Sequence, residues 1–176
     1  MIITVAEAKD LITGIESWKD TKIEQKLKAI EQTIRSYTNN NFQDREYRNT
    51  ADIIGGIFSV KGSPAFVEGD TVMVSYGKNK GLFTVDAVTE NTFSVFEKVV
   101  DESNVIVTKV VYPADVVSAA INMMEWELNN RDKVGVKSET LSRHSVTYFD
   151  QDVNNQVMGY PVSLLGPLKP YKRLRC

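Results

Sequence analysis

Two amphipathic helical stripes, separated by a long segment of different composition, most constrain the fold of this chain. In the first stripe, apolar residues from Ile23 to Tyr37 advance by four, three, four and three positions, as one face of a helix requires. The second stripe comprises Val116, Val117, Ala120, Ile121, Met124 and Leu128, with Trp126 displaced from it. Neither helix can bury its face alone, so we expect the two to pack together in a helical domain.

Two Thr-x-x-Glu sequences predict where helices begin. Thr4 with Glu7, and Thr21 with Glu24, have the spacing of capping boxes. They predict a short helix over about 5–12 and the start of the first long helix. The run of three asparagines after the first stripe is expected to end that helix, because Asn competes with the helical backbone for hydrogen bonds.

The segment between the stripes, residues 51–112, predicts a small antiparallel β-barrel or sandwich. Six of the ten glycines fall within it, and β-branched and aromatic residues alternate with polar ones. The expected strands cover residues 71–76, 83–87, 93–96 and 105–112. Residues 77–81 have the composition of a hairpin loop, with glycines available for positive φ. Four or five short strands with tight turns are typical of a small barrel.

The predicted fold class is therefore α+β, with a small β module inserted between two helices of a helical bundle. Residues 1–50 and 113–135 are assigned to the helical domain, and residues 51–112 to the inserted barrel. Residues 136–176 are assigned to an extended C-terminal segment. Its apolar residues are intermittent, so we expect it to bury little against its own domain and to be ordered by a partner.

Composition excludes several classes of function. The chain has 21 Lys and Arg against 23 Asp and Glu, so no overall basic charge draws it to nucleic acid. One His and one Cys cannot supply the four ligands of a His/Cys zinc site. No phosphate-binding glycine loop and no Gly-x-Ser-x-Gly nucleophile motif is present. We therefore expect no enzyme, no catalytic or metal-binding residue and no cofactor.

Two further absences bear on the remaining possibilities. His144 has no carboxylate within two positions to orient it as a base, which favours a surface or interface histidine. The start of the chain lacks the pattern of a signal peptide, and no stretch approaches the roughly 20 apolar residues that span a bilayer. A soluble, intracellular protein without a membrane partner is expected.

Two basic segments are candidate interaction sites. Lys78, Asn79 and Lys80 form the hairpin loop of the β module, either as a nucleic-acid-binding loop or as a solvated tip. Residues 51–112 contain eight acids and five lysines, which opposes the first alternative. The C-terminal segment combines basic residues with prolines and interface-prone side chains, which favours a docking peptide. Its candidate docking residues are Leu168, Lys169, Tyr171, Lys172, Arg173, Leu174 and Arg175.

A series of weak motifs extends over nearly the whole chain. They are Val5-x-x-Ala8-Lys9, Tyr37-Thr-Asn-Asn-Asn-Phe42, Tyr112-Pro-Ala-Asp115, residues 131–141 with 145–148, and the ending over 160–175. In this order they resemble the head–tail connector (adaptor) proteins of tailed bacteriophages with long non-contractile tails. Residues 66–85 are similar to the small SH3-like barrels that some members of that family carry.

The resemblance implies a structural virion protein. Identical subunits, commonly twelve, would form a ring beneath the portal protein, extend the DNA channel and offer a platform to the next head-completion (stopper) or tail protein. The C-terminal segment would reach the portal, with Tyr171, Arg173 and Arg175 as anchors. The helical domain would form the subunit contacts, and the β module would lie outside the ring or toward tail components. DNA would pass without specific binding, and the protein would reside at the head–tail interface after assembly in the bacterial cytoplasm.

Overall fold

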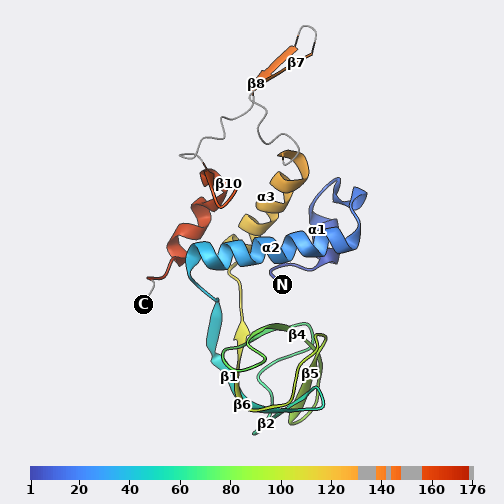
Figure 1. Ribbon diagram of the computed structural model, residues 1–176, viewed down its shortest axis with the longest axis vertical. Helices are drawn as coiled ribbons and strands as arrows, with labels where there is room; N and C mark the ends of the chain where they lie inside the picture. Colours follow the sequence, from blue (N-terminus) through green and yellow to red (C-terminus); the bar gives the residue numbers. More distant parts are fainter. Residues whose placement is uncertain (131–137, 142–143, 148–155, 175–176) are drawn as a thin grey trace. The chain divides into compact units, whose positions relative to one another are not determined.

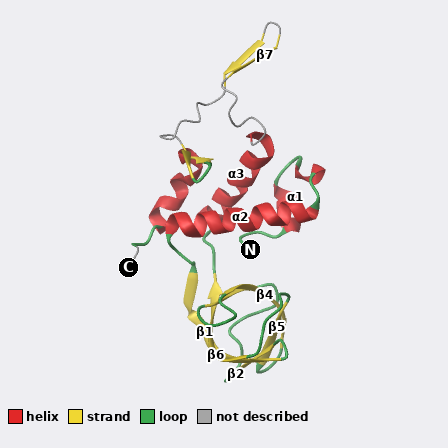
Figure 2. Ribbon diagram, viewed as in Figure 1, coloured by secondary structure: helices red, strands yellow, loops and turns green. Residues whose placement is uncertain are grey.

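The computed structural model describes residues 1–130, 138–141, 144–147 and 156–174 (Figure 1). The chain divides into two compact units, one formed by residues 1–40 with the chain from 113 onward, the other by residues 41–112. The long helices belong to the first unit and a closed barrel forms the second (Figure 2). The predicted α+β class, with a barrel inserted between two helices, is confirmed.

The first unit is built mainly from helices. They are α1 (Val5–Leu11), the 3₁₀ helix η1 (Ile15–Ser17), α2 (Asp20–Thr38), α3 (Ala114–Asn130) and the 3₁₀ helix η3 (Val162–Tyr171). Two antiparallel strand pairs complete its described part: β7 (Ser138–Leu141) with β8 (His144–Thr147), and β9 (Gln156–Val157) with β10 (Tyr160–Pro161). His144 pairs with Leu141 in the first of these ladders.

One of the two predicted capping boxes is present. The Glu7 amide donates to Thr4 Oγ1 at 3.2 Å, and the Thr4 amide donates to Glu7 Oε2 at 2.7 Å. The bonds that the Thr4 amide and the Thr4 hydroxyl donate to the Glu7 carboxylate hold the pKa of Glu7 below its ordinary value. The box predicted at Thr21 is wrong, because α2 begins at Asp20 and Thr21 already lies within its first turn.

The two predicted stripes supply the core of the first unit. In α2 the buried residues include Ile23, Leu27, Ile30 and Ile34, as predicted. In α3 the buried face is rotated from the prediction and comprises Val116, Ala119, Ala120, Met123, Met124 and Glu127. α3 contacts both α2 and η3, so its buried face is set by two partners and not by α2 alone.

The second unit is a closed antiparallel barrel with the strand order β1-β2-β5-β4-β3-β6. Its strands are β1 (Gln43–Ile54), β2 (Ile57–Val60), β3 (Thr71–Val74), β4 (Gly81–Val88), β5 (Thr92–Val95) and β6 (Glu102–Val110). The barrel therefore has six strands where four or five were expected. It begins at residue 41 rather than 51, because β1 starts with a solvent-exposed stretch that lacks an alternating pattern.

Aromatic rings form the centre of the barrel. The rings of Phe58 and Phe93 are stacked with centroids 4.6 Å apart, and Phe66 meets Phe93 edge-on at 5.3 Å. Val72 and Val74 of β3 are both fully buried in the barrel. The barrel thus has a core of its own, separate from that of the helical unit.

The two ends of the barrel segment lie next to each other. The Val111 amide donates to the Phe42 carbonyl at 2.9 Å, and the rings of Phe42 and Tyr112 have centroids 5.1 Å apart. The chain therefore leaves the barrel close to the point where it begins.

Candidate functional site

The C-terminal segment packs into the helical unit, which corrects the expectation of an extended tail for the residues the structure describes. Leu165 and Leu168 are both fully buried. Residues three apart lie on the same side of a 3₁₀ helix, so η3 directs both leucines inward. Leu168, predicted as a docking residue, is therefore a core residue.

A buried hydrogen-bonded cluster holds the start of this segment. Tyr160 donates its hydroxyl to Glu127 Oε1 at 2.8 Å, and Lys26 Nζ lies 2.8 Å from Glu127 Oε2. The carboxylate of Glu127 is buried, and these two partners from β10 and α2 compensate its charge. The cluster joins three parts of the helical unit at one point.

The end of η3 is tied to α3 by a side-chain bond. The hydroxyl of Tyr171 donates to Asp115 Oδ1 at 2.7 Å, in the first turn of α3. The bond and the negative charge of Asp115 both favour the protonated phenol and raise the pKa of Tyr171. The predicted anchor Tyr171 thus has an intramolecular role in this structure.

The backbone after Tyr171 is held against the C-terminal end of α2. The Arg173 amide donates to the Thr38 carbonyl at 2.8 Å. Asn39, in the left-handed conformation at the end of α2, donates from Nδ2 to the Leu174 carbonyl at 2.9 Å. Asn40 Nδ2 donates to the Tyr171 carbonyl at 3.2 Å. Figure 1 shows this end of the chain beside the end of α2.

This arrangement presents positive charge at a helix C-terminus. Lys169, Lys172 and Arg173 are exposed there, and the partial negative charge of the α2 carbonyls favours cations at this place. Lys172 Nζ lies 3.8 Å from the centroid of the Tyr37 ring. Leu174 is 91% exposed. We call Lys169, Lys172, Arg173 and Leu174 the C-terminal basic surface; Arg175 lies outside the described residues.

The lysine hairpin between β3 and β4 is stabilised from within. Glu102 accepts backbone hydrogen bonds from Lys78 at 2.9 Å and from Asn79 at 3.1 Å, which hold the pKa of Glu102 below its ordinary value. Asn79 is buried, and its side chain bonds both the carbonyl and the amide of Val100. Of the three predicted loop residues, only Lys78 and Lys80 are exposed. Asn79 therefore shapes the loop and is not available to a ligand.

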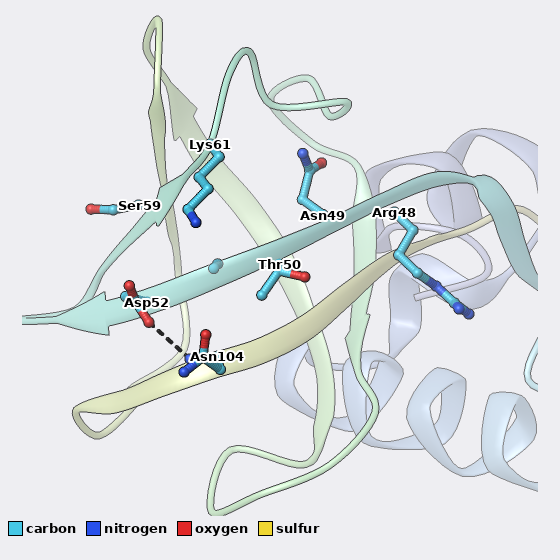
Figure 3. A pocket seen from close by; sticks show the side chains of 8 residues that line it. Arg48, Asn49, Thr50, Asp52, Ser59, Lys61 and Asn104 are labelled. Carbon is cyan, nitrogen blue, oxygen red and sulfur yellow. Dashed lines mark hydrogen bonds between the residues drawn. The ribbon is translucent and has the colours of Figure 1, made fainter.

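A polar groove of about 420 Å³ crosses the outer surface of the barrel (Figure 3). It is lined by Arg48, Asn49, Thr50, Ala51, Asp52, Ser59, Lys61 and Asn104. Asp52 accepts a hydrogen bond from the Asn104 amide at 2.8 Å, and Arg48 Nε donates to Thr108 Oγ1 at 3.0 Å. In Figure 3, the amine of Lys61 points from the end of β2 toward β1. The groove was not predicted, because its residues come together only when β1 is flanked by β2 and β6.

Other kinds of site are not evident in the part of the chain that the structure describes. Within it, no three His, Cys, Asp or Glu side chains are placed to hold a metal ion. No described helix has the length and apolar character needed to cross a membrane. Neither a protein-family model nor a curated protein sequence matches this chain.

The residues that hold the C-terminal end have a partial signal in the sequence. Asn39 and Asn40 stand directly after an amphipathic helix, and Asn at such a place favours the left-handed C-cap that the structure has. Their hydrogen bonds to residues 171–174 have no local sequence signal, because the partners are more than 130 positions away.

Proposed function

We propose that this chain is a head–tail connector protein of a tailed bacteriophage. Identical subunits form a ring under the portal, extend the DNA channel and support the next head-completion or tail protein. The C-terminal basic surface contacts the portal, and the protein resides in the virion at the head–tail interface. The proposal starts from the order of motifs along the sequence.

The C-terminal basic surface is the observation that carries the proposal. Its backbone is fixed to α2 by Thr38, Asn39 and Asn40, whereas its charged side chains and Leu174 face solvent. A partner that binds these side chains does not have to order the chain up to Leu174, so little conformational entropy opposes the contact. The partner surface that this composition fits is acidic and contains an apolar pocket.

Ring formation would multiply a weak contact. When one subunit of a ring has docked, its neighbours bind at high effective concentration, so the whole ring binds far more tightly than one subunit. A portal, itself a ring, offers the repeated surface that such binding requires. Each subunit then needs only a small basic contact.

Charge reversal of the C-terminal basic surface tests the proposal. The double variant Lys172→Glu, Arg173→Glu should keep the helical content of the wild type, because both side chains are exposed. Its affinity for the portal protein encoded in the same genome should fall more than about tenfold, since ring avidity multiplies the loss per subunit. Sedimentation of purified chain with portal rings measures the effect, and electron microscopy of the mixture shows whether a second ring is added.

The control is Lys19→Glu, which changes an exposed lysine elsewhere in the helical unit. It should bind the portal like the wild type. The proposal is contradicted if the double variant binds the portal with the same affinity as the control. It is also contradicted if the wild type does not bind the portal. Duplex DNA binding with a steep salt dependence would instead favour the nucleic-acid-binding alternative.

A further inference from the structure

The outer face of the β1–β2 hairpin is polar and basic at one end and apolar at the other. Exposed and buried residues alternate over residues 50–54 of β1, so that Thr50, Asp52 and Ile54 all point outward. On β2, Ser59 lies opposite Asp52, and Ile57 lies opposite Ile54. The polar groove is therefore followed along the two paired strands by Ile54 and Ile57 at the hairpin tip. We call this continuous surface the hairpin face.

The apolar end of the hairpin face is formed by large, exposed side chains. Ile54 is 69% exposed and Ile57 is 49% exposed. Phe96, 68% exposed, directly follows the end of β5, two positions after Ser94, the partner of Ile57. Exposed large apolar side chains at one end of a small barrel mark an interaction surface.

The other end of the hairpin face carries positive charge. Among the described residues, neither Arg48 nor Lys61 has an ion pair, whereas the one acid of the groove, Asp52, accepts the Asn104 amide. Lys61 stands four residues from Ile57, which is about 13 Å along an extended strand. The face therefore fits a peptide with an apolar group at one end and carboxylates about 13 Å away.

The chain itself contains a segment with this composition. Residues 148–152 read Tyr-Phe-Asp-Gln-Asp, two aromatic residues followed by two acids within the next three positions. The four-residue spacing from Tyr148 to Asp152 equals that from Ile57 to Lys61. Phe42 and Phe66 are also followed by two acids within four positions, but both rings are buried in the described fold. We infer that residues 148–152 of a second copy of this chain bind the hairpin face, with the aromatic residues on the apolar end and the carboxylates toward Lys61 and Arg48.

A contact of this kind joins copies head to tail. The segment of one copy binds the face of the next, so the first copy still has its face and the second its segment for a further contact. Repetition then closes a ring or continues as a filament. The inference rests on the proposed ring assembly for its role. The contact can nevertheless be measured without a portal, and portal binding is measured through Lys172 and Arg173, so either can fail alone.

A labelled synthetic peptide with the sequence of residues 146–155 tests the contact directly. It is titrated against the full chain carrying Phe149→Ser, whose own segment then competes poorly, and binding is followed by fluorescence anisotropy. Adding Ile54→Ser or Lys61→Glu to that chain should weaken binding at least about fivefold. The matched controls are Val67→Ser, 63% exposed in the loop before β3, and Lys80→Glu in the β3–β4 loop. Both controls should leave the affinity unchanged.

Sedimentation velocity then distinguishes a second copy from the same chain. The wild type should self-associate with rising concentration, and Phe149→Ser or Ile54→Ser should each reduce that association. The inference is overturned if the peptide does not bind. It is also overturned if Ile54→Ser and Lys61→Glu leave the peptide affinity unchanged. Peptide binding by a chain whose wild type stays monomeric assigns the segment to its own barrel and also overturns it. Displacement of the peptide by a single-stranded oligonucleotide would identify the hairpin face as a nucleic-acid site. That result would also overturn the inference.

Discussion

Glu102 is the residue on which the conformation of the β3–β4 loop depends. Gly77 has φ +90°, and a Cβ atom at this position would meet the Glu102 carboxylate. Gly56 has nearly the same φ, +86°, with nothing within 4 Å of the position of a Cβ atom. In both Gly→Ala variants the left-handed backbone should lower the free energy of unfolding by about 1–2 kcal/mol. Gly77→Ala should lower it further, because the Glu102 side chain must move and give up its bonds to the loop amides.

Thermal unfolding of the two alanine variants measures the difference. We expect the lower midpoint for Gly77→Ala, and the extra loss should disappear when Glu102→Ala is already present, because the side chain that meets the new Cβ atom is then gone. Equal midpoints for the two variants would contradict the role assigned to Glu102.

The same carboxylate predicts a pH dependence. The bonds from Lys78 and Asn79 lower the pKa of Glu102 in the folded state, so its ionised form stabilises the loop. This contribution is fully present above the ordinary carboxyl pKa and is lost as pH falls through the lowered one. The amide NMR shifts of residues 78 and 79 should therefore titrate together below the usual range of Glu. The assignment would be refuted if these amide shifts titrated at or above the usual range of Glu. It would also be refuted if their pH profile were the same in Glu102→Gln.

At the scale of elements, η3 is part of the helical core. Leu168 is fully buried, and Leu168→Ala should cost about 2–5 kcal/mol in the free energy of unfolding. Leu174 is almost fully exposed, and Leu174→Ala should change that free energy by no more than about 0.5 kcal/mol. Urea denaturation of both variants measures the contrast. If both variants changed the free energy of unfolding by a similarly small amount, η3 would not pack in the core as described.

The elements also show what the sequence could predict. The buried stripe of α2 was predictable because apolar residues that recur about every 3.6 positions identify the buried face of a helix. The packing of η3 was not, because Leu165 and Leu168 are intermittent in sequence and acquire one face only in a 3₁₀ conformation. β1 was missed for a related reason, since residues 45–48 are all exposed and give no alternation. The polar groove and the contacts of Asn39 and Asn40 depend on tertiary pairing, which no local pattern encodes.

At the scale of the whole molecule, the barrel should fold without the helices. It is closed, it has its own aromatic core, and Phe42 near its start accepts a hydrogen bond from Val111 near its end. Residues 41–112, produced alone, should therefore unfold cooperatively and give a dispersed NMR spectrum. In the complementary protein, a short Gly-Ser linker from Asn40 to Pro113 should preserve the helical circular dichroism. An excised barrel without a cooperative transition would show that it depends on the helical unit.

The adjacent ends of the barrel also matter for the evolution of the chain. Because Phe42 and Val111 are backbone partners, the helical unit has to bridge only about 5 Å, the spacing of two paired strands. An in-frame exchange of the coding segment for residues 41–112 can then replace one barrel by another without altering the pairing of α2 with α3. Natural selection can thus act on the barrel and on its helical host at different rates, and recombination can separate their histories.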